Sequence, residues 1–148
     1  MKRTLKQLLC CLFALSILSG TLCYAAEPRS SAYLDSYCAG LTAVDGGGIV
    51  ITVDVAAVVN ATEIGATRID LWESTDGEEF YRIAQLYPED YPLMMGSGWN
   101  YCSDVTTYQG VIGRYYLADV YCYVANATGS DTRIYTTAAE KAVYWAFD

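Results

Sequence analysis

The sequence contains no histidine among its 148 residues. This absence excludes Ser-His-Asp and Cys-His catalysis and most zinc sites, because those arrangements use imidazole as base or ligand. Paired carboxylates remain, for example Glu78 with Glu79, or Asp104 and Asp119 on strands. Adjacent carboxylates on a turn are typical of solvated surface, whereas an acid and base pair needs a separation that only the fold sets. We therefore expect no enzyme and no catalytic residue, and a carboxylate-only enzyme is the weakest alternative.

Oxygen ligands for calcium are also not arranged in a known pattern. Asp45, Asp76 and Asp131 each stand beside glycine or other turn residues. No EF-hand spacing accompanies them, and isolated Asp-Gly pairs are primarily turn formers. The sequence predicts no metal site and no cofactor.

Basic residues are few, and three of the nine lie at the N-terminus as Lys2, Arg3 and Lys6. An apolar run from Leu8 to Leu18 follows, and then small residues at Ala25 and Ala26. This order is typical of a secretory signal peptide over residues 1–26, and the run is too short for a membrane-spanning helix. We expect a secreted, extracellular protein with one domain over residues 27–148.

The expected mature chain is strongly acidic. Six Lys and Arg remain against 17 Asp and Glu, which gives a net charge of −11. Binding to nucleic acid or to an anionic membrane needs clustered Lys and Arg. We therefore expect neither nucleic acid nor membrane as a partner of the mature protein.

Cysteine is also scarce after the expected cleavage, because only Cys38, Cys102 and Cys122 remain. An odd count allows at most one disulfide within the chain, so the chain is not a small disulfide framework. We interpret Cys122 as a small, apolar side chain that is buried in the core.

The chain lacks a long helical pattern and is rich in β-branched and aromatic residues between Gly, Asp, Asn and Ser clusters. This composition predicts an all-β protein. We expect strands over residues 33–41, 48–59, 67–72, 80–86, 99–106, 116–124 and 132–137, with the tail 138–148 either extended or helical. About seven strands spaced roughly ten residues apart favour an antiparallel immunoglobulin-like β-sandwich, with a small barrel as the alternative.

Two of these segments carry a clear pattern of alternation. Around Asp76-Gly77 the pattern indicates a hairpin, because glycine adopts the positive φ of such turns. From Tyr116 to Val124, alternate residues including Cys122 are apolar, and Asp119 falls in the other set. We expect the set with Cys122 to face the core.

The hairpin over residues 69–86 resembles the middle hairpin of fibronectin type III domains, and residues 115–132 resemble the penultimate strand and following turn of that fold. The mature chain as a whole is similar to a family of small secreted proteins from Gram-positive, clostridial-type bacteria whose function is uncharacterised. The matching stretches are residues 29–34, 64–66 and 131–137. The resemblance implies a fibronectin type III-like fold and an extracellular location, and it implies no catalytic residue.

Aromatic residues are the most informative excess, since thirteen of the 14 tyrosines and all three tryptophans lie beyond residue 26. Exposed clusters of such side chains bind sugars, peptides and proteins at low entropic cost. Core packing is the competing interpretation. Trp72 is the better surface candidate, because its neighbours of the same parity are Arg68 and Asp70, although it could also pair across the hairpin with Phe80 or Tyr81. The candidate ligand-contact residues are Trp72, Tyr91, Trp99, Tyr101 and Tyr108.

These features favour a non-enzymatic binding or interaction domain. Its expected partner is a cell-wall polymer, a glycan or another protein. A structural surface or matrix component without a specific ligand is the main alternative.

Overall fold

The computed structural model describes residues 31–144. The expected signal peptide, residues 1–26, therefore lies outside the described residues. Within the described part, no helix is long and apolar enough to cross a membrane.

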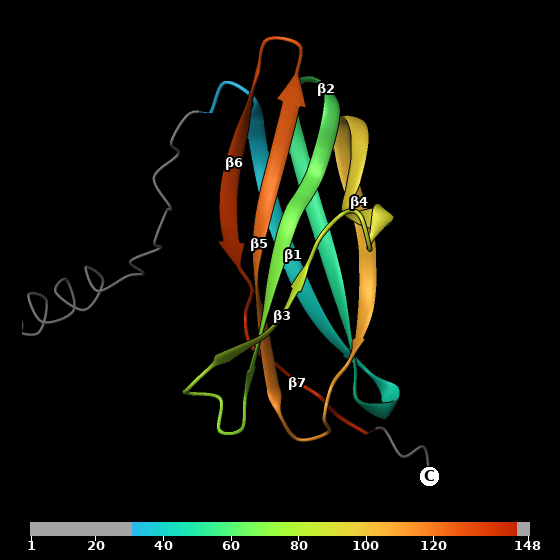
Figure 1. Ribbon diagram of the computed structural model, residues 1–148, viewed down its shortest axis with the longest axis vertical. Helices are drawn as coiled ribbons and strands as arrows, with labels where there is room; N and C mark the ends of the chain where they lie inside the picture. The colour runs from blue at the N-terminus through green and yellow to red at the C-terminus, as the bar shows by residue number, and fades with distance from the viewer. Residues whose placement is uncertain (1–30, 145–148) are drawn as a thin grey trace, which may run out of the picture.

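The described chain is all-β, with seven antiparallel strands and two short 3-10 turns (Figure 1). The strands are β1 (Leu34–Val44), β2 (Gly48–Ser74), β3 (Tyr81–Leu86), β4 (Met95–Gln109), β5 (Tyr115–Asn126), β6 (Gly129–Thr136) and β7 (Glu140–Lys141). The turns are η1 (Asp45–Gly47) and η2 (Pro92–Met94).

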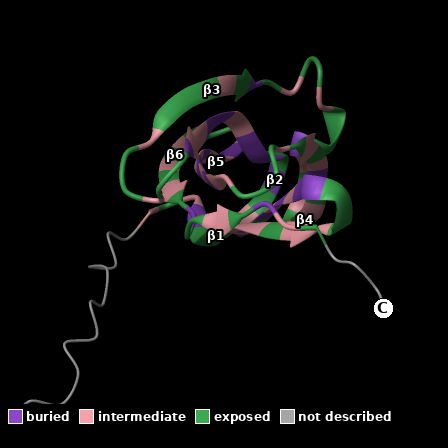
Figure 2. Cartoon of the chain, turned by 90° about the horizontal axis from the view of Figure 1, so that it is seen from below, coloured by how far each residue is buried: buried purple, intermediate pink, exposed green. Residues whose placement is uncertain are grey.

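Strand β2 holds the sheet together because it pairs with four other strands. Its first part, residues 48–56, lies between β1 and β4. Its last part, residues 66–74, pairs with β5 and, from residue 69, with β3, while residues 61–65 contact β4. Strand β6 adds to the far side of β5. The single sheet therefore curls around its own core, with β1 and β4 on one side and β3 on the other (Figure 2).

The core is made by the inward face of each strand. Alternate residues of β2 are fully buried from Ile49 to Val55, as the alternation predicts. Near Thr67 the pairing with β5 shifts register, so that Ile69 and Leu71 again face inward after Ala66. The predicted inward set of β5 is confirmed, because all its members are fully buried: Tyr116, Ala118, Val120, Cys122 and Val124.

The predicted hairpin is confirmed, and its turn is held by side chains. Gly77 has a φ of +84°, which a residue with a β-carbon rarely adopts. Oδ1 of Asp76 accepts hydrogen bonds from the amides of Glu78 and Glu79, at 2.9 and 3.1 Å. The Ser74 hydroxyl donates to the same oxygen at 2.8 Å. These bonds lower the pKa of Asp76 to about 2.

A second hydrogen-bonded group joins the ends of β2 and β5. The ring of Tyr116 is buried, and its hydroxyl donates to Oε2 of Glu73 at 2.6 Å. The same hydroxyl accepts from the amide of Val111 at 2.8 Å, and Arg114 pairs with the other carboxylate oxygen of Glu73. Burial, followed by the bond to Glu73, raises the pKa of Tyr116 to about 12.

Two predicted boundaries were wrong. The strands expected at 48–59 and 67–72 are one continuous strand, because residues 57–63 contain neither Pro nor Gly and form an irregularity in the pairing instead of a turn. Strand β4 begins at Met95, four residues early, because the irregular connection ends at η2. Of the two alternatives for the tail, its described part takes the extended one, and β7 pairs with β5.

Replacing Tyr116 by Phe should lower the free energy of unfolding by about 1–3 kcal/mol, because the change leaves the Val111 amide and the Glu73 carboxylate without their shared partner. Urea unfolding measures this loss. Tyr123→Phe is the control, since the Tyr123 hydroxyl makes no hydrogen bond to another described residue and should change stability by less than about 0.5 kcal/mol.

The turn at Asp76-Gly77 should also contribute to the loss of folding stability at acid pH. The folded pKa of Asp76, about 2, lies below its ordinary value of 3.8, so the stabilisation is present above the ordinary value and is lost as pH falls toward 2. In Asp76→Asn, the free energy of unfolding should therefore fall less than in the wild type between about pH 5 and pH 2. Glu78→Gln is the control in the same turn. If the free energy of unfolding falls equally with pH in the wild type and in Asp76→Asn, the stabilising role of the Asp76 carboxylate is contradicted.

Candidate functional site

The structure places the five candidate aromatic residues in different surroundings. Tyr91, Tyr101 and Tyr108 are half-buried and pack against the core. Tyr101 also donates a hydrogen bond from its hydroxyl to the carbonyl of Leu93 at 2.5 Å, which fixes the connection before β4. Only Trp72 and Trp99 are directed away from the core, so the candidates do not form one cluster.

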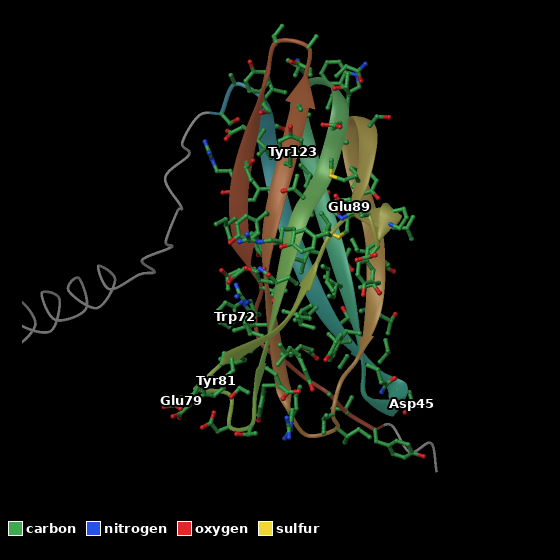
Figure 3. All side chains as sticks on the ribbon, in the orientation of Figure 1. Asp45, Trp72, Glu79, Tyr81, Glu89 and Tyr123 are labelled. Atoms are coloured by element: carbon green, nitrogen blue, oxygen red, sulfur yellow. The ribbon has the colours of Figure 1, made fainter. Side chains whose placement is uncertain are left out.

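Trp72 lies on the outer surface formed by β3, the last part of β2, β5 and β6, which we call the Trp72 face (Figure 3). Its expected outward direction is confirmed. In the hairpin it pairs with Arg82 and not with Phe80 or Tyr81, because the register shifts between Leu71 and Trp72.

The orientation of the Trp72 ring is fixed by Asp119. The indole Nε1–H donates to Oδ2 of Asp119 at 2.9 Å. The other carboxylate oxygen accepts from the Thr136 hydroxyl at 2.6 Å. Three neighbouring strands, β2, β5 and β6, thus hold one tryptophan in place.

Asp70 forms a second polar centre on the Trp72 face, directly opposite Asp119 in the pairing of β2 with β5. Its side chain is only 4 % exposed. Gln85 donates to Oδ1 at 2.9 Å, and Arg82 lies 3.8 Å from Oδ2. Arg68 also lies beside Asp70 on the Trp72 face. Two arginines therefore approach one buried carboxylate.

Arg68 links this centre to an aromatic ring. Its Nε is 3.2 Å from Oδ1 of Asp70, but the N–H bond is not aligned with that oxygen, so the contact is an ion pair without a good hydrogen bond. Its guanidinium carbon lies 3.8 Å from the centre of the Tyr121 ring, which is a close cation–π contact. The side chain of Arg68 is therefore held between a carboxylate and a ring.

The Trp72 face is electrically balanced and combines several kinds of contact group. Two arginines stand against two carboxylates, and the nearby Ile134 side chain is 55 % exposed. Guanidinium and amide donors lie next to an oriented indole and a tyrosine ring. Such a surface can bind a ligand that combines apolar faces with hydrogen-bonding groups.

Sequence reasoning singled out Trp72, Arg68 and Asp70 but missed the roles of Asp119 and Tyr121. The alternation of β5 did place both residues outward. Their partners could not be named, because they depend on the register between β2 and β5, which brings together residues about 50 positions apart.

Trp99 lies on a different strand and in a different setting. It is 56 % exposed on β4, where the pairing with β2 is interrupted between residues 56 and 61. No polar side chain among the described residues bonds to its indole nitrogen. It is exposed but not oriented by neighbours.

Comparison of the chain with protein-family models, curated proteins and solved structures found no match. The similarity to the family of clostridial-type secreted proteins therefore stays a prediction.

Asp119→Ala should release the Trp72 ring. The indole N–H resonance of Trp72, assigned with Trp72→Phe, should shift and exchange with solvent faster in this variant. Losing a hydrogen bond to a charged group should also lower the free energy of unfolding by about 1.5–3 kcal/mol, measured in urea. An unchanged indole resonance would show that Asp119 does not orient the ring.

Proposed function

We propose that this protein is a non-enzymatic extracellular recognition domain with a fibronectin type III-like sandwich fold, and that it binds its ligand through the Trp72 face. The proposed ligands are a cell-wall polymer, a glycan or a protein. The proposal rests mainly on one observation, the half-buried Trp72 ring that Asp119 holds in a fixed orientation on the outer surface.

The strand pairing supports the sandwich part of the proposal. The two halves of the bent β2 can be counted as two separate strands. Strand β1, the first half of β2 and β4 then lie together in one group, and the second half of β2, β5 and β6 lie side by side in the other. Immunoglobulin-like sandwiches divide their strands in this way.

Tyr116 gives further support for that fold. It stands near the start of the penultimate strand of the proposed sandwich, and its hydroxyl bonds to the backbone of Val111, five residues earlier. A tyrosine with this placement and this bond is the tyrosine corner of immunoglobulin-like domains.

Two observations favour recognition over catalysis on this face. Each oxygen of Asp119 accepts a hydrogen bond, and each oxygen of Asp70 faces a cation or an amide donor. An oxygen that already accepts a hydrogen bond from a neighbouring side chain is less available for proton exchange with a substrate. These carboxylates are suited to positioning other side chains.

The extracellular location rests on residues 1–26, whose basic start, apolar run and small residues have the order of a secretory signal. The acidic composition of the remaining chain is consistent with a soluble secreted domain.

The test is a binding screen of the purified protein against insoluble peptidoglycan and a glycan array, followed by pull-down against secreted proteins. Trp72→Ala should weaken binding at least about tenfold, because aromatic anchors in recognition surfaces contribute 2 kcal/mol or more. Trp99→Ala, an exposed tryptophan on another strand, is the matched control and should bind like the wild type. Binding that Trp72→Ala leaves intact would refute the role of the Trp72 face.

A further inference from the structure

One edge of the sheet is open along β4. This strand pairs with β2 on one side, and no other described strand pairs with its second side. Figures 1 and 2 show β4 at the margin of the fold. An unpaired edge presents backbone N–H and C=O groups that another strand can use, and natural proteins usually protect such edges with charge or proline.

The β4 edge lacks this protection over most of its length. Residues 95–103 contain no charged residue and no proline, and Asp104 is the one charged residue of the strand. The other outer strands differ from β4: β6 carries Asp131 and Arg133, and β3 has only six residues. Strand β1 has a single charge, Asp35, as β4 does, but its Tyr37 ring packs edge-on against Tyr135 of β6, so that β6 lies beside it.

Cys102 lies at the centre of the longest stretch of β4 that pairs with β2 without interruption. Asn100 to Asp104 pair with β2 without interruption, and register shifts flank this stretch on both sides. The stretch is centred on Cys102, which is exposed and free. An antiparallel partner with the same sequence, placed about a two-fold axis at Cys102, would put Asp104 opposite Asn100 of the second copy. The two Asp104 carboxylates would then not face each other.

We propose that a second copy of this chain pairs antiparallel with the β4 edge, centred on Cys102, so that one sheet runs through both copies. This inference is independent of the proposed function of the Trp72 face. In this arrangement the two Cys102 α-carbons lie about 4.5–5.5 Å apart. That spacing is within the range of a disulfide.

The other cysteines cannot take the place of Cys102. Cys38 lies in the same row on β1, with Asp54 of β2 between them, so the α-carbons of Cys38 and Cys102 are two strand spacings, about 10 Å, apart. This distance is too long for a disulfide within the chain. Cys122 is fully buried, and burial raises its thiol pKa to about 12.

The disulfide can be formed with oxidised glutathione. The thiolate of Cys102 attacks the glutathione disulfide and releases one glutathione thiol. The Cys102 thiolate of the second copy then attacks the mixed disulfide and releases the second. The two cysteine thiols are oxidised to one disulfide, and one oxidised glutathione is reduced to two thiols.

The experiment measures association of the purified protein by sedimentation and then traps it with oxidised glutathione. We expect a reversible dimer, a dimer band on a non-reducing gel and a Cys102–Cys102 linked peptide in mass spectrometry. Cys102→Ser should lose the band but keep the reversible dimer, and Cys38→Ser should keep both.

Charge variants test the register. Asn100→Asp places like charges opposite each other twice per dimer, so its dimer should be about tenfold weaker at low salt. The double variant Asn100→Asp with Asp104→Asn exchanges the facing pair and should restore the affinity. Thr75→Asp adds the same charge on an exposed residue of the turn between β2 and β3, which does not pair with β4, and should have no effect.

Three results would overturn the proposal. These are a monomer at every concentration, cross-links through Cys38 as readily as through Cys102, or equal dimerisation of Asn100→Asp and the wild type. If the protein stays monomeric and Cys102 forms only mixed disulfides with glutathione, the partner of the β4 edge is a strand of another protein and not a second copy.

Discussion

The rest of the structure depends on the backbone pairing of β2. This one strand of 27 residues pairs with β1, β3, β4 and β5, so it contributes to both sides of the core. A sheet with one continuous strand through its bend cannot separate into two independent halves. At Gly65 the backbone of β2 approaches so close to Met94 that an added β-carbon would lie 2.1 Å from the Met94 carbonyl oxygen, and only glycine permits this approach.

The same pairing decides which polar groups meet on the surface. Asp70 and Asp119 lie opposite each other because β2 and β5 are in register there, and each carboxylate then collects donors from its neighbours. Two like charges directly opposite each other destabilise a sheet, and the donors on each carboxylate offset this repulsion. What distinguishes the Trp72 face is that the pairs hold an indole ring in a fixed direction, which lowers the entropy lost when a ligand contacts it.

The two proposed surfaces use different physical properties of a sheet. The Trp72 face offers side chains on a surface that is already paired, so specificity there comes from ring position and hydrogen bonds. The β4 edge offers backbone groups, so affinity there comes from main-chain hydrogen bonds and register. Because the surfaces lie on different strands, a paired copy on β4 leaves Trp72 accessible, and two Trp72 faces in one assembly would increase avidity for a repetitive ligand.

The sequence by itself determined the all-β class, the hairpin at Asp76-Gly77 and the inward set of β5, because turn chemistry and period-two alternation are local properties. It also directed Trp72 outward. It did not determine the continuity of β2, since the segment between its two halves lacks a turn signal and only pairing with β1, β4 and β5 keeps it extended. The tertiary structure alone decided that Asp119 orients Trp72 and that β4 is left with an open edge, because both depend on which distant strands become neighbours.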